Sequence, residues 1–194
     1  TGQASPVVVH FHGGAFMSGN LDNGCKVASL LESAGAVVVS VAYPLTPFPQ
    51  PVDTGYGVLK WVHKRRTKLG GQGSAVYLAG EEAGGNLAAA VALMARDQSH
   101  PALAGQILLS PMLDPCVGTA SVREATGNAT GCKWTEGWRN FLRCPRDAEH
   151  PYAVPAGAQR LAGLPPTLIL VGDTDPMRDE ALAYAARLEA AGLP

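Results

Sequence analysis

The 194-residue sequence has little of the charge or continuous apolar character that nucleic-acid-binding and membrane-spanning proteins need. Charged residues make up 16% of the chain, and the 15 basic and 16 acidic side chains nearly cancel to a formal net charge of −1. No sequence-wide positive field therefore attracts nucleic acid or anionic lipid. No apolar run approaches the roughly 20 residues of a membrane-spanning helix. We expect neither a nucleic-acid partner nor a membrane span.

The sequence also lacks paired metal-ligand motifs. Its four cysteines are Cys25, Cys116, Cys132 and Cys144, and none belongs to a C-x-x-C pair, which argues against a structural zinc site. We expect free thiols, although a disulfide between two of the last three stays open. We expect no metal and no cofactor. The stretch 128–130 matches the glycosylation pattern N-x-T, which is common by chance.

The chain starts at Thr1 without a methionine, and no signal-peptide pattern is visible. We expect residues 1–194 to be one domain of a longer protein, truncated at both ends. Its localisation is left open, with the cytoplasm slightly favoured.

Hydrophobic residues make up 46% of the sequence, and they fall in short strand-like and longer helix-like segments that alternate. The expected strands are 7–11, 36–43, 75–79, 104–110 and 168–171, and the expected helices are 26–33, 52–68, 83–95 and 179–191. This alternation predicts an α/β fold with a mainly parallel sheet of about five strands, covered by helices on both faces. Ligands bind such sheets at the carboxyl ends of the strands.

Helical spacing predicts which side chains face the core. Trp61 belongs to the apolar positions of 52–68, and the expected inner face of the last helix is Leu182, Ala185, Ala186 and Leu188. Residues 115–165 form an insertion with little strand character. Its apolar positions Trp134, Trp138, Phe141 and Leu142 are spaced as in an amphipathic helix. We interpret this insertion as a cap over the site.

The motif that carries most information is Gly80–Asn86, which reads GEEAGGN. It follows a predicted strand and opens a predicted helix, where G-x-S-x-G enzymes place a nucleophilic serine on a tight turn. The glycines are present, but Glu82 stands in place of the serine. The sequence therefore predicts the scaffold of a serine hydrolase with an altered reactive group.

A second glycine motif, His12–Phe16, directly follows the first strand. In H-G-G-G-type motifs the backbone N–H groups of this turn stabilise a substrate oxyanion together with the residue after the nucleophile. The expected oxyanion donors are the amides of Gly13, Gly14 and Ala83.

These two motifs, with Ser110–Asp114 and Asp173–Glu180, resemble the hormone-sensitive-lipase-like carboxylesterase branch of the α/β-hydrolase family. The resemblance covers nearly the whole chain. It implies hydrolysis of small or medium carboxylic esters and Asp175 as the triad acid, with Asp173 as the alternative. Asp179 and Glu180 are expected to favour the start of the last helix through its dipole. All five histidines precede Asp175, so the resemblance implies a catalytic histidine beyond Pro194.

A carboxylate at the position of Glu82 faces a helix N-terminus and several backbone donors, so we expect its pKa to be lowered and its oxygens to occupy the oxyanion hole. Ordinary ester hydrolysis should then be impaired. Two alternatives stay open. One is a non-catalytic protein that binds a small acyl ligand, and the other is a hydrolase that uses Glu82 as a carboxylate nucleophile. A homodimer also stays open.

Overall fold

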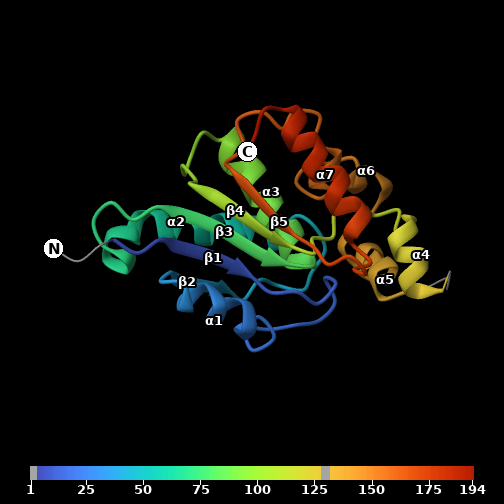
Figure 1. Ribbon diagram of the computed structural model, residues 1–194, viewed down its shortest axis with the longest axis horizontal. Coiled ribbons are helices and arrows are strands. Elements are labelled where there is room, and N and C mark those ends of the chain that lie inside the picture. The colour runs from blue at the N-terminus through green and yellow to red at the C-terminus, as the bar shows by residue number, and fades with distance from the viewer. Residues whose placement is uncertain (1–3, 128–131) are drawn as a thin grey trace.

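The computed structural model describes residues 4–127 and 132–194, and these residues build a parallel sheet in the order β2-β1-β3-β4-β5 (Figure 1). The strands are β1 (Val7–Phe11), β2 (Val37–Val41), β3 (Val76–Glu81), β4 (Gly105–Leu109) and β5 (Thr167–Leu170). The predicted five-stranded α/β fold is confirmed, because every neighbouring pair of strands is parallel. The expected strands agree with these bounds to within two residues.

Helices connect the strands and cover the sheet. They are α1 (Cys25–Ser33), α2 (Gln50–Gly70), α3 (Ala83–Asp97), α4 (Ala120–Thr126), α5 (Lys133–Phe141), α6 (Pro145–Ala148), the 3-10 turn η1 (Pro155–Gly157) and α7 (Arg178–Ala190). The chain runs from β1 to β2 in one direction across the sheet and then back over β1 to β3. Because parallel crossovers are right-handed, this reversal puts α1 on one face and α2 and α3 on the other (Figure 1).

The reversal also fixes where a ligand site can form. The carboxyl ends of β1 and β3 lie side by side, with Phe11 paired to Gly80. The loops that leave these two strands run in opposite directions, which opens a crevice at this edge of the sheet. The predicted glycine motif and the predicted turn at Glu82 both start here.

Helix α3 is the centre of the core. Nearly all of its residues are buried, including the run Ala88–Ala90, and it packs against β1, β3 and β4. Small side chains let the helix approach the sheet closely, which holds its first residues in a fixed place.

Three expectations about buried positions were wrong. Trp61 on α2 is 45% exposed, Leu182 on α7 is 55% exposed, and Ala186 on α7 is exposed as well. Leu188 is buried as expected, and the other buried residues of α7 are Glu180, Ala181 and Tyr184. Helix α7 thus buries one narrow stripe, and the side chains to either side of that stripe face outward.

The insertion 115–165 contains α4, α5, α6 and η1, so the expected amphipathic helix is present as α5. Trp138 and Phe141 are buried as expected. The four cysteines, all of them in the described residues, are free thiols, as predicted. The glycosylation pattern at 128–130 lies outside the described residues.

Candidate functional site

A strained turn at Glu82 joins β3 to α3. Its backbone has φ 54° and ψ −116°, outside the usual regions for a residue with a side chain. The turn is held from both sides, since Glu82 N donates to Leu109 O (3.0 Å) and Glu82 O accepts from Met112 N (3.0 Å). Such over-determined strain is typical of functional sites.

Glycines make this turn feasible. A Cβ on Gly84 would lie 2.1 Å from the carbonyl oxygen of Phe11, and a Cβ on Gly80 would lie 2.2 Å from the carbonyl oxygen of Gly84. Neither position has room for a side chain. Strand β1, strand β3 and the start of α3 therefore approach each other closely only because these two residues are glycines.

The glycine loop 12–18 after β1 faces this turn. Gly14 has φ +126°, and Ala15 and Phe16 also have positive φ values of 50° and 59°. Tyr43 holds the start of this loop in place. Its hydroxyl donates to His12 O (2.7 Å), and its ring stacks on the His12 ring with 4.3 Å between the ring centres. Burial of this hydroxyl, with a smaller contribution from the two nearby glutamates, raises the pKa of Tyr43, which keeps it a donor.

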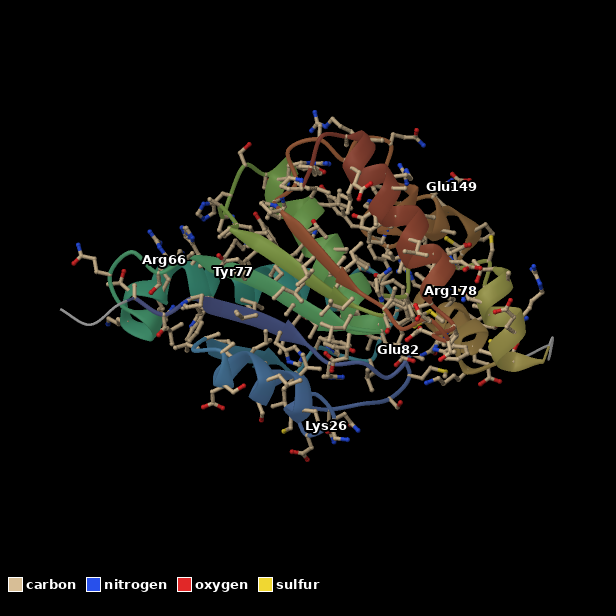
Figure 2. The ribbon with its side chains drawn as sticks, viewed as in Figure 1. Lys26, Arg66, Tyr77, Glu82, Glu149 and Arg178 are labelled. Atoms are coloured by element: carbon tan, nitrogen blue, oxygen red, sulfur yellow. The ribbon has the colours of Figure 1, made fainter. Side chains whose placement is uncertain are left out.

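Glu82 places its carboxylate between this loop and α5 (Figure 2). Oε2 accepts from Gly14 N (2.8 Å), and Oε1 accepts from Trp134 Nε1 (2.8 Å) and lies 2.9 Å from Lys133 Nζ. The side chain is 20% exposed. Burial alone would raise the pKa of Glu82, but the hydrogen bonds from Lys133, Gly14 and Trp134 outweigh burial and lower it. The predicted direction of the pKa shift is thus confirmed, although two of the donors come from α5.

Glu81, the residue before Glu82, is bound by a side chain of strand β1. Its Oε2 lies 2.7 Å from Nε2 of His10, which is fully buried in β1. Because a carboxylate only accepts, His10 Nε2 carries the proton in this pair. His10 Nδ1 lies 3.1 Å from Ser40 Oγ, so both ring nitrogens have partners.

Gly13 was expected to offer its amide to a substrate oxygen. In the structure Gly13 N donates to Glu81 Oε1 (3.2 Å), so this amide already has a partner, and Gly14 N is the loop donor that reaches Glu82. Ala83, the third expected donor, is the fully buried first residue of α3. No sequence signal distinguishes the two glycine amides, because their assignment depends on the direction of the Glu81 side chain.

Asp175 lies in the loop between β5 and α7, at the same edge of the sheet as Glu82. Ser110 Oγ donates to its Oδ2 (2.6 Å), and Met177 N donates to its Oδ1 (2.7 Å). Two donors therefore fix the orientation of this carboxylate. Asp173, the alternative acid, is exposed, and its carbonyl oxygen accepts from Arg178 (2.7 Å).

Glu180 does not act as a solvated acidic residue in the first turn of α7. It is 8% exposed and accepts a hydrogen bond from Asp114 N at 2.6 Å. Burial is the largest influence, and it raises the pKa of Glu180 to about 8 despite the backbone donors.

The remaining histidines lie elsewhere. His150 packs between the rings of Phe48 (4.9 Å) and Tyr152 (5.1 Å), and His63 packs against His100 (5.0 Å). Across residues 4–127 and 132–194, no group of three or more His, Cys, Asp or Glu side chains is arranged to hold a metal ion. No helix in the same residues is long and apolar enough to cross a membrane.

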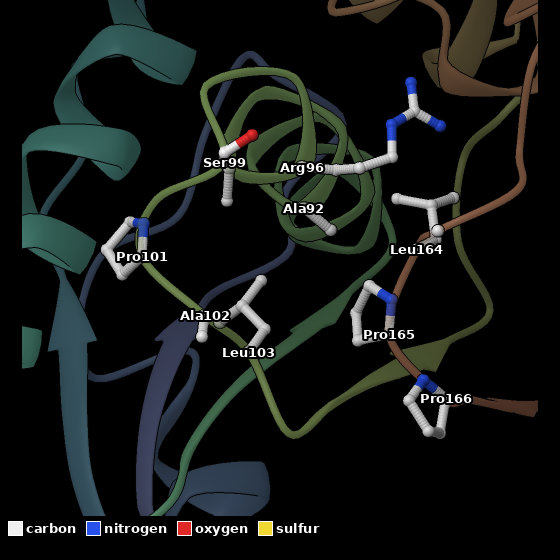
Figure 3. Close-up of a pocket in the computed structure, with 11 residues that line it drawn as sticks. Ala92, Arg96, Ser99, Pro101, Ala102, Leu103, Leu164, Pro165 and Pro166 are labelled. Carbon is white, nitrogen blue, oxygen red and sulfur yellow. The ribbon is translucent and has the colours of Figure 1, made fainter.

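A cavity of about 430 Å³ lies at the opposite end of the sheet (Figure 3). Its walls include Arg96 at the end of α3, Ser99 just after that helix, Leu103 before β4 and the stretch 163–166 before β5. These residues mark the amino ends of the strands, away from Glu82 and Asp175. The cavity is therefore separate from the site described above.

Comparison with known proteins identifies the family. Residues 8–194 match the family described as alpha/beta hydrolase fold, and the chain belongs to it. The solved structure of a hyperthermophilic esterase from the archaeon Pyrobaculum calidifontis is 37% identical with a TM-score of 0.90, covering 100% of this chain and 66% of that one. The expected resemblance to the esterase branch of this family is confirmed.

Two curated relatives differ in what they do. Esterase LipI of Mycobacterium tuberculosis is 33% identical over 204 residues, which cover 98% of this chain and 62% of the esterase. A gibberellin receptor of Arabidopsis thaliana is 36% identical over 209 residues, which cover 98% of this chain and 59% of the receptor. The chain thus spans about three fifths of the length of the curated relatives that it matches.

Proposed function

We propose that this chain forms the acyl site of a carboxylic-ester hydrolase in which Glu82 stands at the nucleophile position and ordinary ester hydrolysis is impaired. The observation that carries the proposal is the turn at Glu82. It has positive φ, it joins β3 to α3, and its carboxylate is bound to the amide of Gly14. A turn of this kind presents a nucleophile in related hydrolases.

The other roles follow from the positions around this turn. Gly14 and Ala83, with Gly13 once Glu81 releases it, are the candidate oxyanion donors. Asp175 is the candidate triad acid, since two donors hold its carboxylate at the same edge of the sheet. The insertion 115–165 acts as a cap, because α5 contacts Glu82 through two side chains. The esterase relatives support a small acyl or ester ligand.

Impairment follows from the chemistry of the carboxylate. A serine becomes a nucleophile when a neighbouring base removes its proton, and Glu82 has no such proton to give. Its charge is stabilised by three donors, which lowers its reactivity. Its side chain is also one methylene longer than the aspartate that carboxylate-nucleophile hydrolases use, and a misplacement of about 1 Å can cost about a hundredfold in rate.

Turnover of p-nitrophenyl butyrate by the full-length protein tests the proposal. We expect negligible turnover by the unchanged protein and a gain of at least about a hundredfold in Glu82→Ser, in line with the contribution of a positioned acid–base partner. Thr46→Ser, a substitution outside the site, controls for trace esterase contamination. Rapid turnover by the unchanged protein that Glu82→Ala abolishes, or no gain in Glu82→Ser, would contradict the proposal.

A non-catalytic binding function is the second candidate. It is favoured by the saturation of the Glu82 carboxylate with donors and by gibberellin receptors among the relatives. A ligand that raises the melting temperature without product formation, in both the unchanged protein and Glu82→Ser, would favour this function. A covalent adduct on Glu82 found by mass spectrometry would instead favour a carboxylate nucleophile.

A further inference from the structure

Three donors of different kinds converge on the Glu82 carboxylate. They are the amide of Gly14 at 2.8 Å, the indole N–H of Trp134 at 2.8 Å and the ammonium group of Lys133 at 2.9 Å. Both oxygens are engaged, and two of the donors come from an insertion that is far from Glu82 in the sequence. Charge-assisted hydrogen bonds of this length are about twice as strong as neutral ones.

From this geometry we infer that Gly14, Trp134 and Lys133 form a receptor for a free carboxylate, and that Glu82 fills this receptor in the unchanged protein. Lys133 and Trp134 are then specificity-determining residues. They select a carboxylic acid over its ester, because an ester brings no negative charge for the ammonium group. The inference rests on the proposed function only in locating the ligand site at Glu82.

The receptor is organised before any ligand arrives. Helix α5 sits directly on the glycine loop, where a Cβ on Gly137 would lie 2.1 Å from Ala15 O. The Phe16 and Phe141 rings stack at 4.1 Å with an interplanar angle of 7°. Asn140 Nδ2 also donates to Phe16 O (3.4 Å). Contacts along α5 thus hold Trp134 and Lys133 in place without the help of Glu82, which reduces the entropy lost on binding.

Each donor contributes differently. Lys133 is 59% exposed, so solvent screens its charge, and it lies 4.9 Å from the centre of the Trp134 ring. The hydrogen bonds from the Gly14 amide and the Trp134 indole are part-buried, so water competes less with them. We therefore expect all three to set affinity and Lys133 to set the preference for a charged ligand.

Sodium butyrate is the probe, and the melting temperature of the protein is the readout. In Glu82→Ala the receptor is empty, so butyrate should raise the melting temperature in a saturable way, whereas methyl butyrate and sodium chloride at matched ionic strength should not. The unchanged protein should not respond, because Glu82 competes from within the same molecule. A response of the unchanged protein equal to that of Glu82→Ala would overturn the inference.

Second substitutions in the Glu82→Ala background test the two selecting residues. Adding Lys133→Met should weaken butyrate binding by about threefold, in line with the loss of a screened ion pair. Adding Trp134→Phe should weaken it at least as much, because its hydrogen bond is part-buried. Lys60→Met and Trp61→Phe, at exposed positions of α2, are the matched controls and should leave affinity unchanged. Equal affinity with and without Lys133 would overturn the inference.

Glu82→Ser provides the same comparison if Glu82→Ala fails to fold. The two proposals are separable, since they are read out differently. Butyrate binding without esterase activity in Glu82→Ser keeps the receptor and contradicts the proposed function. Esterase activity in Glu82→Ser, without butyrate binding in either variant, would support the proposed function and contradict the carboxylate receptor.

Discussion

The neighbouring carboxylates Glu81 and Glu82 lie against two walls of the site that are built differently. Glu81 is bound by the strand side, through His10 of β1 and the amide of Gly13. Glu82 is bound by the helix side, through Lys133 and Trp134 of α5, and by the amide of Gly14. The strand side belongs to the buried core, whereas the helix side is a short amphipathic helix laid over the glycine loop.

This difference separates what the fold fixes from what the insertion adds. His10 is held by sheet pairing on both of its sides, so moving it means breaking β1 away from β2 or β3. Helix α5 is held by side-chain contacts with the loop and can change without disturbing the sheet. We expect damage to the strand side to unfold the protein and damage to the helix side to act locally.

The largest effect is expected for Gly84→Ala, which breaks the strand side. Its Cβ would lie 2.1 Å from the Phe11 carbonyl oxygen, so β1 and α3 must separate, and we expect a loss of about 3 kcal/mol in the free energy of unfolding. Urea denaturation measures this loss. Gly57→Ala is the control, because no atom lies within 4 Å of its Cβ in α2, and it should stabilise by up to about 1 kcal/mol. Equal free energies of unfolding for Gly84→Ala and Gly57→Ala would show that the close approach of β1 and α3 does not limit stability.

A smaller and local effect is expected for Gly137→Ala, which breaks the helix side. The new Cβ would lie 2.1 Å from Ala15 O and push α5 off the glycine loop. Amide hydrogen exchange should become faster in residues 133–141 while the strands stay protected, with a global cost of about 1 kcal/mol. Faster exchange in β1 and β3 as well would show that the two sides are one cooperative unit.

The smallest effect is expected for Glu82→Gln, which tests how the charge of Glu82 on the helix side contributes to stability at different pH values. Because the folded-state pKa of Glu82 is lowered, its ionisation stabilises the fold above the ordinary glutamate pKa, and this contribution disappears as the pH falls through the lowered value. Glu82→Gln removes that contribution. The unchanged protein should therefore exceed Glu82→Gln in melting temperature at pH 7, and the difference should shrink below the ordinary glutamate pKa and vanish below the lowered value in the folded state. A difference that persists there would point to packing instead of charge.

Sequence patterns were sufficient for the strands, for the turn at Glu82 and for the position of α5. Short apolar runs predict buried strands, and glycines predict tight turns, because both depend only on neighbouring residues in the sequence. Trp61 and Leu182 were misplaced because helical spacing leaves the width of the buried stripe open. That width is set by what packs on the helix.

The partners of Glu82 show a second limit of sequence patterns. Trp134 was recognised as an apolar position of an amphipathic helix, but the contact it makes with Glu82 is a hydrogen bond from its indole N–H. Lys133 carried no signal at all. Contacts across 51 and 52 positions of the chain depend on how α5 is rotated over the loop, and no local pattern encodes that rotation.

The glycine loop and the turn at Glu82 meet in register, with two successive amides of the loop bound to two successive glutamates. Adding one residue between Phe11 and Gly13 would move each of these amides on by one carboxylate. The amide of Gly13, now bound to Glu81, would then face Glu82. The length of this short loop thus determines that Glu81 is bound on the strand side and Glu82 beside α5.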